Sequence, residues 1–250
     1  MYFHGLILAG LLLVLGTPGA AQTSADKTAD MATIRVQLSA EHEARLASQM
    51  EGRIVALPRA LGERFRKGDL LVGFACDHHK AALAAAEAQY VRTTKNLESR
   101  QSLLELQAIP ELELELARAE QAQAAAEVAR YKAVVSDCKV LAPFAGSVVK
   151  VHVNQWETVG RGTVLIHVVN QDSLYIEALI PSSWLSWLAP GHVFTVSVDE
   201  LGKDVSAEIT AIGGRIDPVS QTVPVKARIT SSAEGLLPGM SGNARFSPEQ

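Results

Sequence analysis

The sequence predicts an α+β protein of several domains: a split β-sandwich, an antiparallel α-helical coiled-coil hairpin inserted into it, and a small antiparallel β-barrel. Three observations lead to this prediction. Two stretches, 52–74 and 146–168, repeat one another without a gap. The chain between them has helical periodicity, and the chain after them alternates as short strands do. The insert therefore interrupts a β-domain that is built from both repeats.

The composition is that of a globular chain without a nucleic-acid partner. Of 250 residues, 48% are hydrophobic and 20% are charged, and the formal net charge is −4. Nucleic-acid-binding domains usually carry a basic patch, which this balance does not indicate. The length allows two or three small domains rather than one large core.

The first 21 residues indicate an export signal. Leu6 to Leu15 is an apolar run, and small residues precede a cleavage point after Ala21. The run is shorter than the ~20 residues that span a bilayer. Because His4 precedes it but no Lys or Arg does, cleavage and retention as an anchor both stay open. Residues 22–32 are expected to form a flexible lead.

The two repeats share one physical plan. Each opens with a glycine, Gly52 or Gly146, before a short strand of alternating apolar residues. A turn follows, in which Gly68 or Gly162 suits a backbone with positive φ. A second apolar strand closes each copy. Neither copy can bury its apolar face alone, so we expect the two to pack together as one sandwich.

Between the copies the sequence predicts a helical hairpin over 76–138. From Asp77 to Gln107 there is no Pro or Gly. An apolar stripe repeats every seven residues along this stretch: Leu83, Tyr90, Leu97 and Leu104. The segment Ala108-Ile109-Pro110 then interrupts the helix, because proline disfavours helix at the residue before it and suits the first turn of a new one.

A second helix is expected from about Pro110 to Val134. The stripe assigned to its side of the seam is mostly alanine and consists of Leu112, Leu116, Ala119, Ala126 and Ala133. Two helices of similar length joined by a tight turn form an antiparallel pair. Since this seam is lean in large apolar residues, we favour hairpins that pack against neighbouring subunits over a purely structural hairpin.

The last third of the chain predicts a small β-barrel. Five stretches alternate as strands, separated by Gly/Pro turns: Leu174 to Ile180, His192 to Val198, Val205 to Ile212, Val223 to Ile229 and Ala244 to Phe246. Ile34 to Leu38 is expected to add a strand from the N-terminal side.

Four motifs in this order resemble those of a known family. They are KGDLL at 67–71, APFAGSVV at 142–149, DPVSQT at 217–222 and LPGM at 237–240. The chain resembles, over roughly residues 33–247, the periplasmic adaptor proteins, or HlyD-like membrane fusion proteins, of tripartite efflux and type I secretion systems. The resemblance implies that the sandwich is lipoyl-like.

The resemblance also implies a function without catalysis. Such adaptors are structural and coupling components, in rings of commonly six copies, in the periplasm at the inner membrane. They link an inner-membrane transporter, of the RND or ABC type, to an outer-membrane channel of the TolC type. The hairpin tip contacts the channel, and Arg100, Leu104 and Ile109 are its expected docking residues. The family's tip serine is replaced here by Glu111.

The expected boundaries divide the chain into eight parts. They are a signal peptide at 1–21, the lead at 22–32, the first part of the barrel at 33–51, the first sandwich half at 52–75, the hairpin at 76–138, the second half at 139–170, the barrel at 171–247 and a tail at 248–250.

The only two cysteines, Cys76 and Cys138, flank the predicted helices. In an antiparallel hairpin both lie at its base, and the expected compartment is oxidising, so we expect a disulfide, with two buried free thiols as the alternative. Cys76 to His79 could also suggest a metal site. Four consecutive residues point in different directions, however, so we expect no metal there.

Two other functions stay open. A lipoyl or biotinyl carrier domain would present an acceptor lysine between the two halves, where this chain has the hairpin. A purely structural envelope coiled coil would need neither the repeat nor the barrel. No catalytic residue or cofactor is expected, because GxSxG, HExxH and P-loop motifs are lacking.

Overall fold

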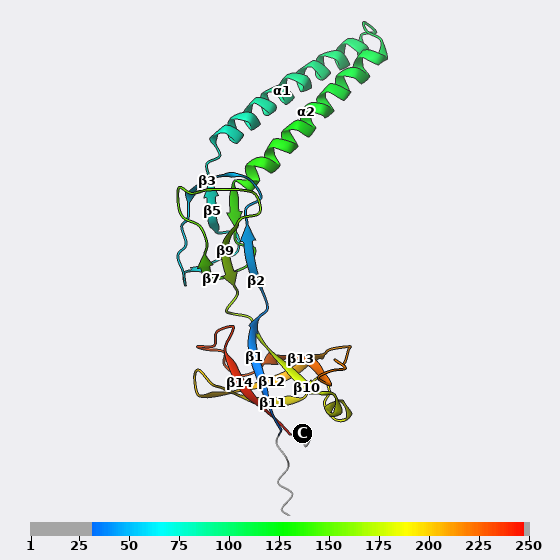
Figure 1. Cartoon of the computed structure of the whole chain (residues 1–250). Coiled ribbons are helices and arrows are strands. Elements are labelled where there is room, and N and C mark those ends of the chain that lie inside the picture. Colours follow the sequence, from blue (N-terminus) through cyan, green and yellow to red (C-terminus); the bar gives the residue numbers. More distant parts are fainter. Residues whose placement is uncertain (1–31, 248–250) are drawn as a thin grey trace, which may run out of the picture.

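The computed structural model describes residues 32–247, which form three parts in a line. A β-barrel lies at one end, a domain of two β-sheets in the middle, and a pair of long helices at the other end (Figure 1). The described part of the chain starts in the barrel, runs out through the middle domain and the helices, and returns by the same route. The barrel and the middle domain are therefore each built from two separate segments.

The middle domain joins strands from both sides of the helical insert, and we call it the split β-domain. Its strands are β2 (Glu43–Ala47), β3 (Gly52–Ala56), β4 (Arg64–Phe65) and β5 (Leu70–Phe74), then β6 (Lys139–Leu141), β7 (Gly146–Val151), β8 (Thr158–Val159) and β9 (Val164–Val169). They form two four-stranded sheets, in the orders β2-β9-β7-β4 and β6-β5-β3-β8. Ile54, Leu71, Val148 and Leu165 are fully or almost fully buried in one shared core. Neither repeat could complete a sheet alone.

The two repeats make matching backbone contacts across this domain. The amide of Gly62 in the first copy donates to the carbonyl of Val148, at 2.9 Å. At the matching positions, the amide of Trp156 donates to the carbonyl of Ile54, at 2.8 Å. Each turn is therefore held by the first strand of the other copy, which gives the domain an approximate two-fold symmetry.

The expected assignment of residues 33–51 to the barrel is wrong in its second half. Strand β2 pairs antiparallel with β9 of the split β-domain. Ala44 and Leu46 are half-buried and pack against the core of that domain. Their alternation with exposed Glu43 and Arg45 matches one buried sheet face, which explains why β2 belongs there.

The predicted antiparallel barrel is confirmed, with the N-terminal strand as its sixth member. Its elements are β1 (Ala32–Ala40), β10 (Leu174–Pro181), the short helix η1 (Ser182–Ser186), β11 (Val193–Val198), β12 (Lys203–Ile212), β13 (Thr222–Ile229) and β14 (Ser241–Phe246). The strands close in the order β1-β10-β13-β12-β11-β14. Leu38, Ile176, Ile180 and Phe246 are buried inside. β1 therefore closes the barrel between β10 and β14.

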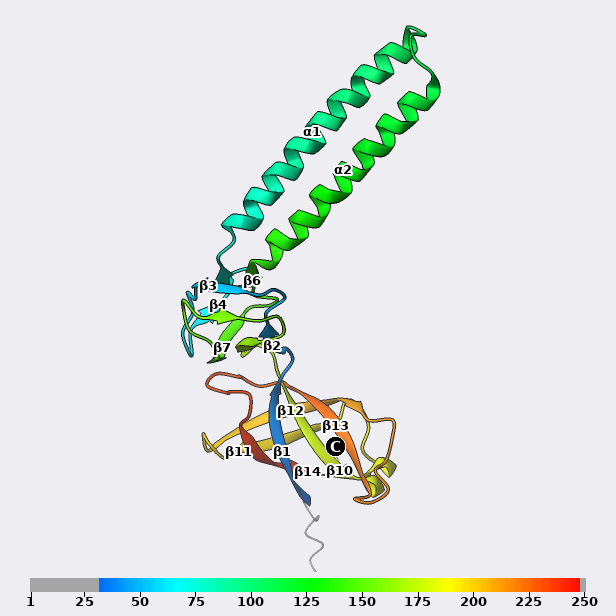
Figure 2. The same ribbon diagram turned by 45° about the horizontal axis from the view of Figure 1, so that its top comes forward.

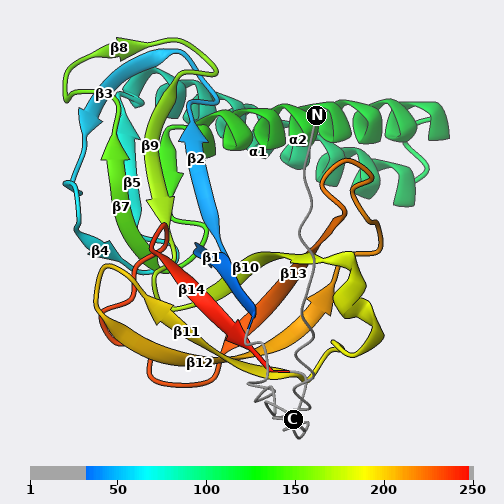
Figure 3. The ribbon, with the colours of Figure 1, turned by 60° about the horizontal axis from the view of Figure 1, so that its bottom comes forward.

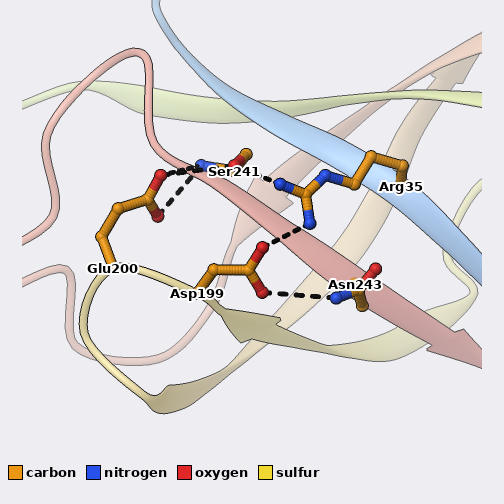
Figure 4. A network of polar contacts seen from close by, with 5 residues as sticks. All are labelled: Arg35, Asp199, Glu200, Ser241 and Asn243. Carbon is orange, nitrogen blue, oxygen red and sulfur yellow. Dashed lines mark hydrogen bonds and ion pairs between the residues drawn. The ribbon is translucent and has the colours of Figure 1, made fainter.

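A polar network on the barrel surface holds β1 against β14 and the turn after β11 (Figure 4). Arg35 on β1 forms an ion pair with Asp199 and donates to the hydroxyl of Ser241 at 2.7 Å. Asn243 donates to the other oxygen of Asp199, and Glu200 accepts from the backbone amide of Ser241 at 3.0 Å. Because such exposed pairs contribute only about 0–1 kcal/mol each, the network orients the turn more than it stabilises the barrel.

The two ends of the barrel carry different connections (Figure 3). At one end, β1 and β10 join the split β-domain through two linkers, and the amide of Glu41 donates to the carbonyl of Ser173 at 2.9 Å. The opposite end carries the start of β1, the β10–β11 connection at 182–192 and the β12–β13 loop at 213–221. This second end faces away from the helices (Figure 1).

Candidate assembly surfaces of the helical hairpin

The hairpin consists of α1 (Asp77–Glu105) and α2 (Glu111–Asp137), which lie side by side in opposite directions (Figures 1 and 2). At a rise of ~1.5 Å per residue, each is about 40 Å long. Asp77, Glu111 and Glu113 lie in the first turns, where a carboxylate is favoured by the helix dipole. Within the described residues, neither helix combines the length and apolarity that would cross a bilayer.

A disulfide joins the base of the hairpin. Cys76 directly precedes α1 and Cys138 directly follows α2, and the structure links them with a Cα–Cα distance of 5.9 Å. Both cysteines are buried in the core of the split β-domain. The Cys76 sulfur is therefore engaged in this bond, and both helices leave the domain from fixed points.

The expected α1 stripe lies on the face of the helix that carries its buried residues. Leu83, Tyr90 and Leu97 are half-buried, and Ala86 and Thr93 are buried between them. These five positions follow one another at spacings of three and four, so they share one helix face. The Thr93 hydroxyl donates to backbone carbonyls of its own helix, which satisfies it without a partner from α2.

The expected α2 stripe is wrong, because it lies on the outer face of the hairpin. Leu112 and Leu116 are 68% and 57% exposed. The buried α2 residues are instead Leu114, Ala117, Ala124 and Val128. Both sets have heptad-like spacing, and the size of the residues in them does not separate the two. The buried set continues at spacings of three and four to half-buried Tyr131 and Val135, whereas the outer set is interrupted by exposed Arg130. Turning the first face inward buries more apolar surface and leaves the charge in water.

The structure shows how the three expected docking residues at the tip are held. Arg100 forms an ion pair with Glu113 on α2 instead of pointing freely outward. Leu104 and Ile109 are half-buried. The most exposed large apolar side chain at the tip is Leu106, which is 76% exposed. The ELELEL segment at 111–116 indicates that α2 turns some leucines outward near the tip, since alternating leucines on a helix cannot all face the same partner.

The outer face of α2 carries a row of exposed apolar residues, interrupted by Gln123 and Arg130, which we call the outer stripe. It consists of Leu112, Leu116, Ala119, Ala126 and Ala133, all exposed. Two pairs of charged residues are joined along α2, Glu115 with Arg118 and Glu127 with Arg130. The hydrogen bond from Arg130 lowers the pKa of the Glu127 carboxyl. The outer stripe therefore offers a second helix an apolar surface with satisfied charges beside it.

Comparison with known proteins gives a consistent result. A family model described as the CusB-like β-barrel domain matches residues 173–250. The nickel-cobalt-cadmium resistance protein NccB of Alcaligenes xylosoxydans xylosoxydans is 28% identical over 200 residues, which cover 74% of this chain and 48% of NccB. A solved structure from Bacteroides eggerthii DSM 20697, described as an efflux transporter, has a TM-score of 0.72 at 26% identity and covers 86% of this chain and 68% of that one.

The fold also matches the membrane fusion protein Spr0693 of Streptococcus pneumoniae R6, with a TM-score of 0.71 at 19% identity, covering 86% of this chain and 99% of that one. The chain spans about half the length of the curated relatives it matches, 54% and 48% for two of them. The chain therefore carries a CusB-like β-barrel domain and is similar, over most of its length, to a metal-resistance protein and to a structure described as an efflux transporter.

Proposed function

We propose that this chain is a periplasmic adaptor that links an inner-membrane transporter to an outer-membrane channel in efflux or secretion, without catalytic activity of its own. The observation that carries the proposal is the linear arrangement of the barrel, the split β-domain and the hairpin (Figure 1). Such a shape suits a connector, because its two ends are held far apart by two helices of 29 and 27 residues. The carrier alternative is disfavoured, since the hairpin replaces the turn that would present an acceptor lysine.

The finer features of this proposal concern the split β-domain and the compartment. We take the split β-domain as lipoyl-like, because the matching contacts of its two copies give the two-fold plan of that fold. The expected signal peptide at 1–21, the expected lead at 22–32 up to residue 31, and the tail at 248–250 lie outside the described residues. Export to the periplasm is proposed from the sequence of 1–21 alone. The RND class of transporter is favoured by the CusB-like barrel match.

Ring assembly is proposed to use the outer stripe of α2. An apolar strip of leucines and alanines on an exposed helix face suits close packing with a helix from a second copy of this chain. Six copies and a TolC-type channel are the expected arrangement. Leu112→Glu with Leu116→Glu should abolish cross-linked oligomers in vivo, because paired burial of these leucines would be lost. Leu61→Glu on the split β-domain is the matched control, since Leu61 is 73% exposed but lies off the hairpin.

Docking at the tip is tested by site-specific photo-cross-linking. A photoreactive amino acid at Leu106 should capture an outer-membrane channel protein in intact cells. The same amino acid at Leu61, an equally exposed leucine far from the tip, should not. Arg100→Ala should leave capture intact, because its guanidinium is paired with Glu113 within the hairpin. Capture from Leu61 but not from Leu106 would contradict the adaptor role.

A further inference from the structure

The barrel end that faces away from the hairpin carries an unusual connection. Residues 182–192 contain two tryptophans and two leucines but no Lys, Arg, Asp or Glu. Surface connections are usually polar. Trp184 packs on Phe246 with ring centroids 5.3 Å apart and stays half-buried, while Leu185 beside it is exposed. The connection thus closes the barrel end and still presents apolar surface to its surroundings.

A second apolar point lies on the neighbouring loop at 213–221. The amide of Ser182 donates to the carbonyl of Gln221 at 2.9 Å, which places this loop beside the connection. The Asp217 carboxylate accepts from the amides of Val219 and Ser220, at 2.9 Å each. These bonds lower the pKa of Asp217 and hold the turn in one shape. Val219 is 92% exposed, so a built turn displays an apolar side chain outward.

The connection is also neutral at physiological pH. Its only titratable side chain is His192, and burial lowers the pKa of this imidazole. A lowered pKa keeps histidine in its neutral form at pH 7. The ring packs beside Trp187, with centroids 5.5 Å apart. The neighbouring loop adds two exposed charges of opposite sign, Arg215 and Asp217. An uncharged connection that combines indole rings and aliphatic side chains suits the boundary between water and lipid, where tryptophan is enriched.

The path of the chain points to the same environment. β1 starts at Ala32 on this end of the barrel. The apolar run from Leu6 to Leu15 precedes it in sequence, separated by residues 16–31. Sixteen residues reach at most about 55 Å when fully extended. If this run stays in the membrane as an anchor, it holds the barrel end that carries Ala32 closer to the membrane than any other part of the described chain.

We propose that this end of the barrel rests on the surface of a phospholipid bilayer, with Trp184, Leu185 and Val219 entering the headgroup region. The contact goes beyond the adaptor role, since it requires neither a channel at the hairpin tip nor a ring. It would orient the long axis of the molecule away from the membrane (Figure 1). A transporter surface is the competing occupant, and the experiment below separates the two.

The test uses tryptophan fluorescence of the full chain on vesicles of phosphatidylethanolamine and phosphatidylglycerol. The chain has three tryptophans, and Trp156→Phe leaves only the two of the barrel end. Brominated acyl chains should quench this variant. The matched control, Trp184→Phe with Trp187→Phe, keeps Trp156 on the split β-domain and should not be quenched. Equal fluorescence of the Trp156→Phe variant with brominated and plain lipid, while the protein sediments with vesicles, would overturn the proposal.

A second set of variants guards against misfolding of the tryptophan variants. In the Trp156→Phe background, Leu185→Asp with Val219→Asp should weaken quenching about tenfold, because two apolar side chains no longer leave water. Leu237→Asp is the control, since Leu237 is exposed in the β13–β14 loop at the opposite barrel end. An equal loss of quenching in the double variant and in Leu237→Asp would count against the proposal. Binding to a detergent-solubilised transporter through this end, with no vesicle binding, would identify a protein partner instead of lipid.

Discussion

The two copies within the split β-domain use the same backbone plan with different side chains. In the first copy, Gly62 occupies its turn with a φ of 79°. In the second, Trp156 occupies the matching position with a φ of 74°. Left-handed backbone suits glycine and is unfavourable for a bulky residue. The comparison teaches that the turn geometry is imposed by the sheets, because the second copy keeps it even with an unsuitable residue.

The opening glycines, Gly52 and Gly146, differ in the other direction, because here the second copy is the less tolerant of a larger residue. A Cβ added at Gly146 would lie 2.1 Å from the carbonyl oxygen of Val169, a distance that atoms cannot adopt. A Cβ added at Gly52 would meet the ring of Phe74 at 3.3 Å, which a side chain can relieve by moving slightly. The second copy is therefore strict at its first strand and tolerant at its turn.

The largest expected effect comes from cutting the covalent link between the copies. Cys76 follows the first copy and Cys138 precedes the second, 62 residues apart. Replacing both with alanine should lower the free energy of unfolding by about 4 kcal/mol, because a long loop is no longer closed in the unfolded chain. Urea denaturation of the variant and of wild type measures this. Wild type treated with reductant should match the variant, and two titratable free thiols in untreated wild type would contradict the disulfide.

The next effect tests the opening glycines. Gly146→Ala should lower the free energy of unfolding by about 3 kcal/mol, because the backbone of β7 must move away from β9. Gly52→Ala should cost about 1 kcal/mol or less, since the Phe74 ring can shift. Paired urea melts give the difference. Equal costs would mean that the two first strands are packed alike, against the geometry.

These differences mark how far the sequence predicts the fold. The repeat was visible because glycine turns and apolar alternation are local features. The place of β2 was missed because its partner, β9, lies far along the chain and no local signal names it. The α2 seam was misassigned because two sets of residues share the heptad spacing. The discriminating signal lies further along α2, where Tyr131 and Val135 continue the inner face and Arg130 interrupts the outer one.

The candidate site was less predictable than the fold. The docking positions at the tip were carried over by resemblance, and an ion pair between Arg100 and Glu113 depends on how two helices align. The sequence picks out the residues of the outer stripe but assigns them to the seam, and only the structure shows that they face outward. The base was the exception: Cys76 and Cys138 flank the two helices directly, so any antiparallel hairpin brings them together.

A smaller effect is expected at the turns. Trp156→Gly should raise the free energy of unfolding by about 1 kcal/mol, because glycine relieves the left-handed backbone. Gly62→Ala should lower it by about 1 kcal/mol for the same reason. No atom lies within 4 Å of a Cβ added at Gly62, so its cost comes from φ alone. Urea midpoints of both variants measure these changes. The Trp156 indole lies 5.9 Å from the Arg53 guanidinium. A destabilised Trp156→Gly variant would show that contacts of the indole stabilise the fold by more than the left-handed backbone costs.

The smallest effect should be the same in both copies. Glu63 accepts the amide of Ala60 at 2.7 Å, and Glu157 accepts the amide of Asn154 at 2.8 Å. Each carboxylate fixes its own turn, so Glu63→Ala and Glu157→Ala should each lower the free energy of unfolding by about 0.5 kcal/mol. The glutamine variants keep an acceptor and should recover most of it. A loss of stability for Glu63→Ala but not for Glu157→Ala would mean that the sheets hold the turn at Trp156 without help from Glu157.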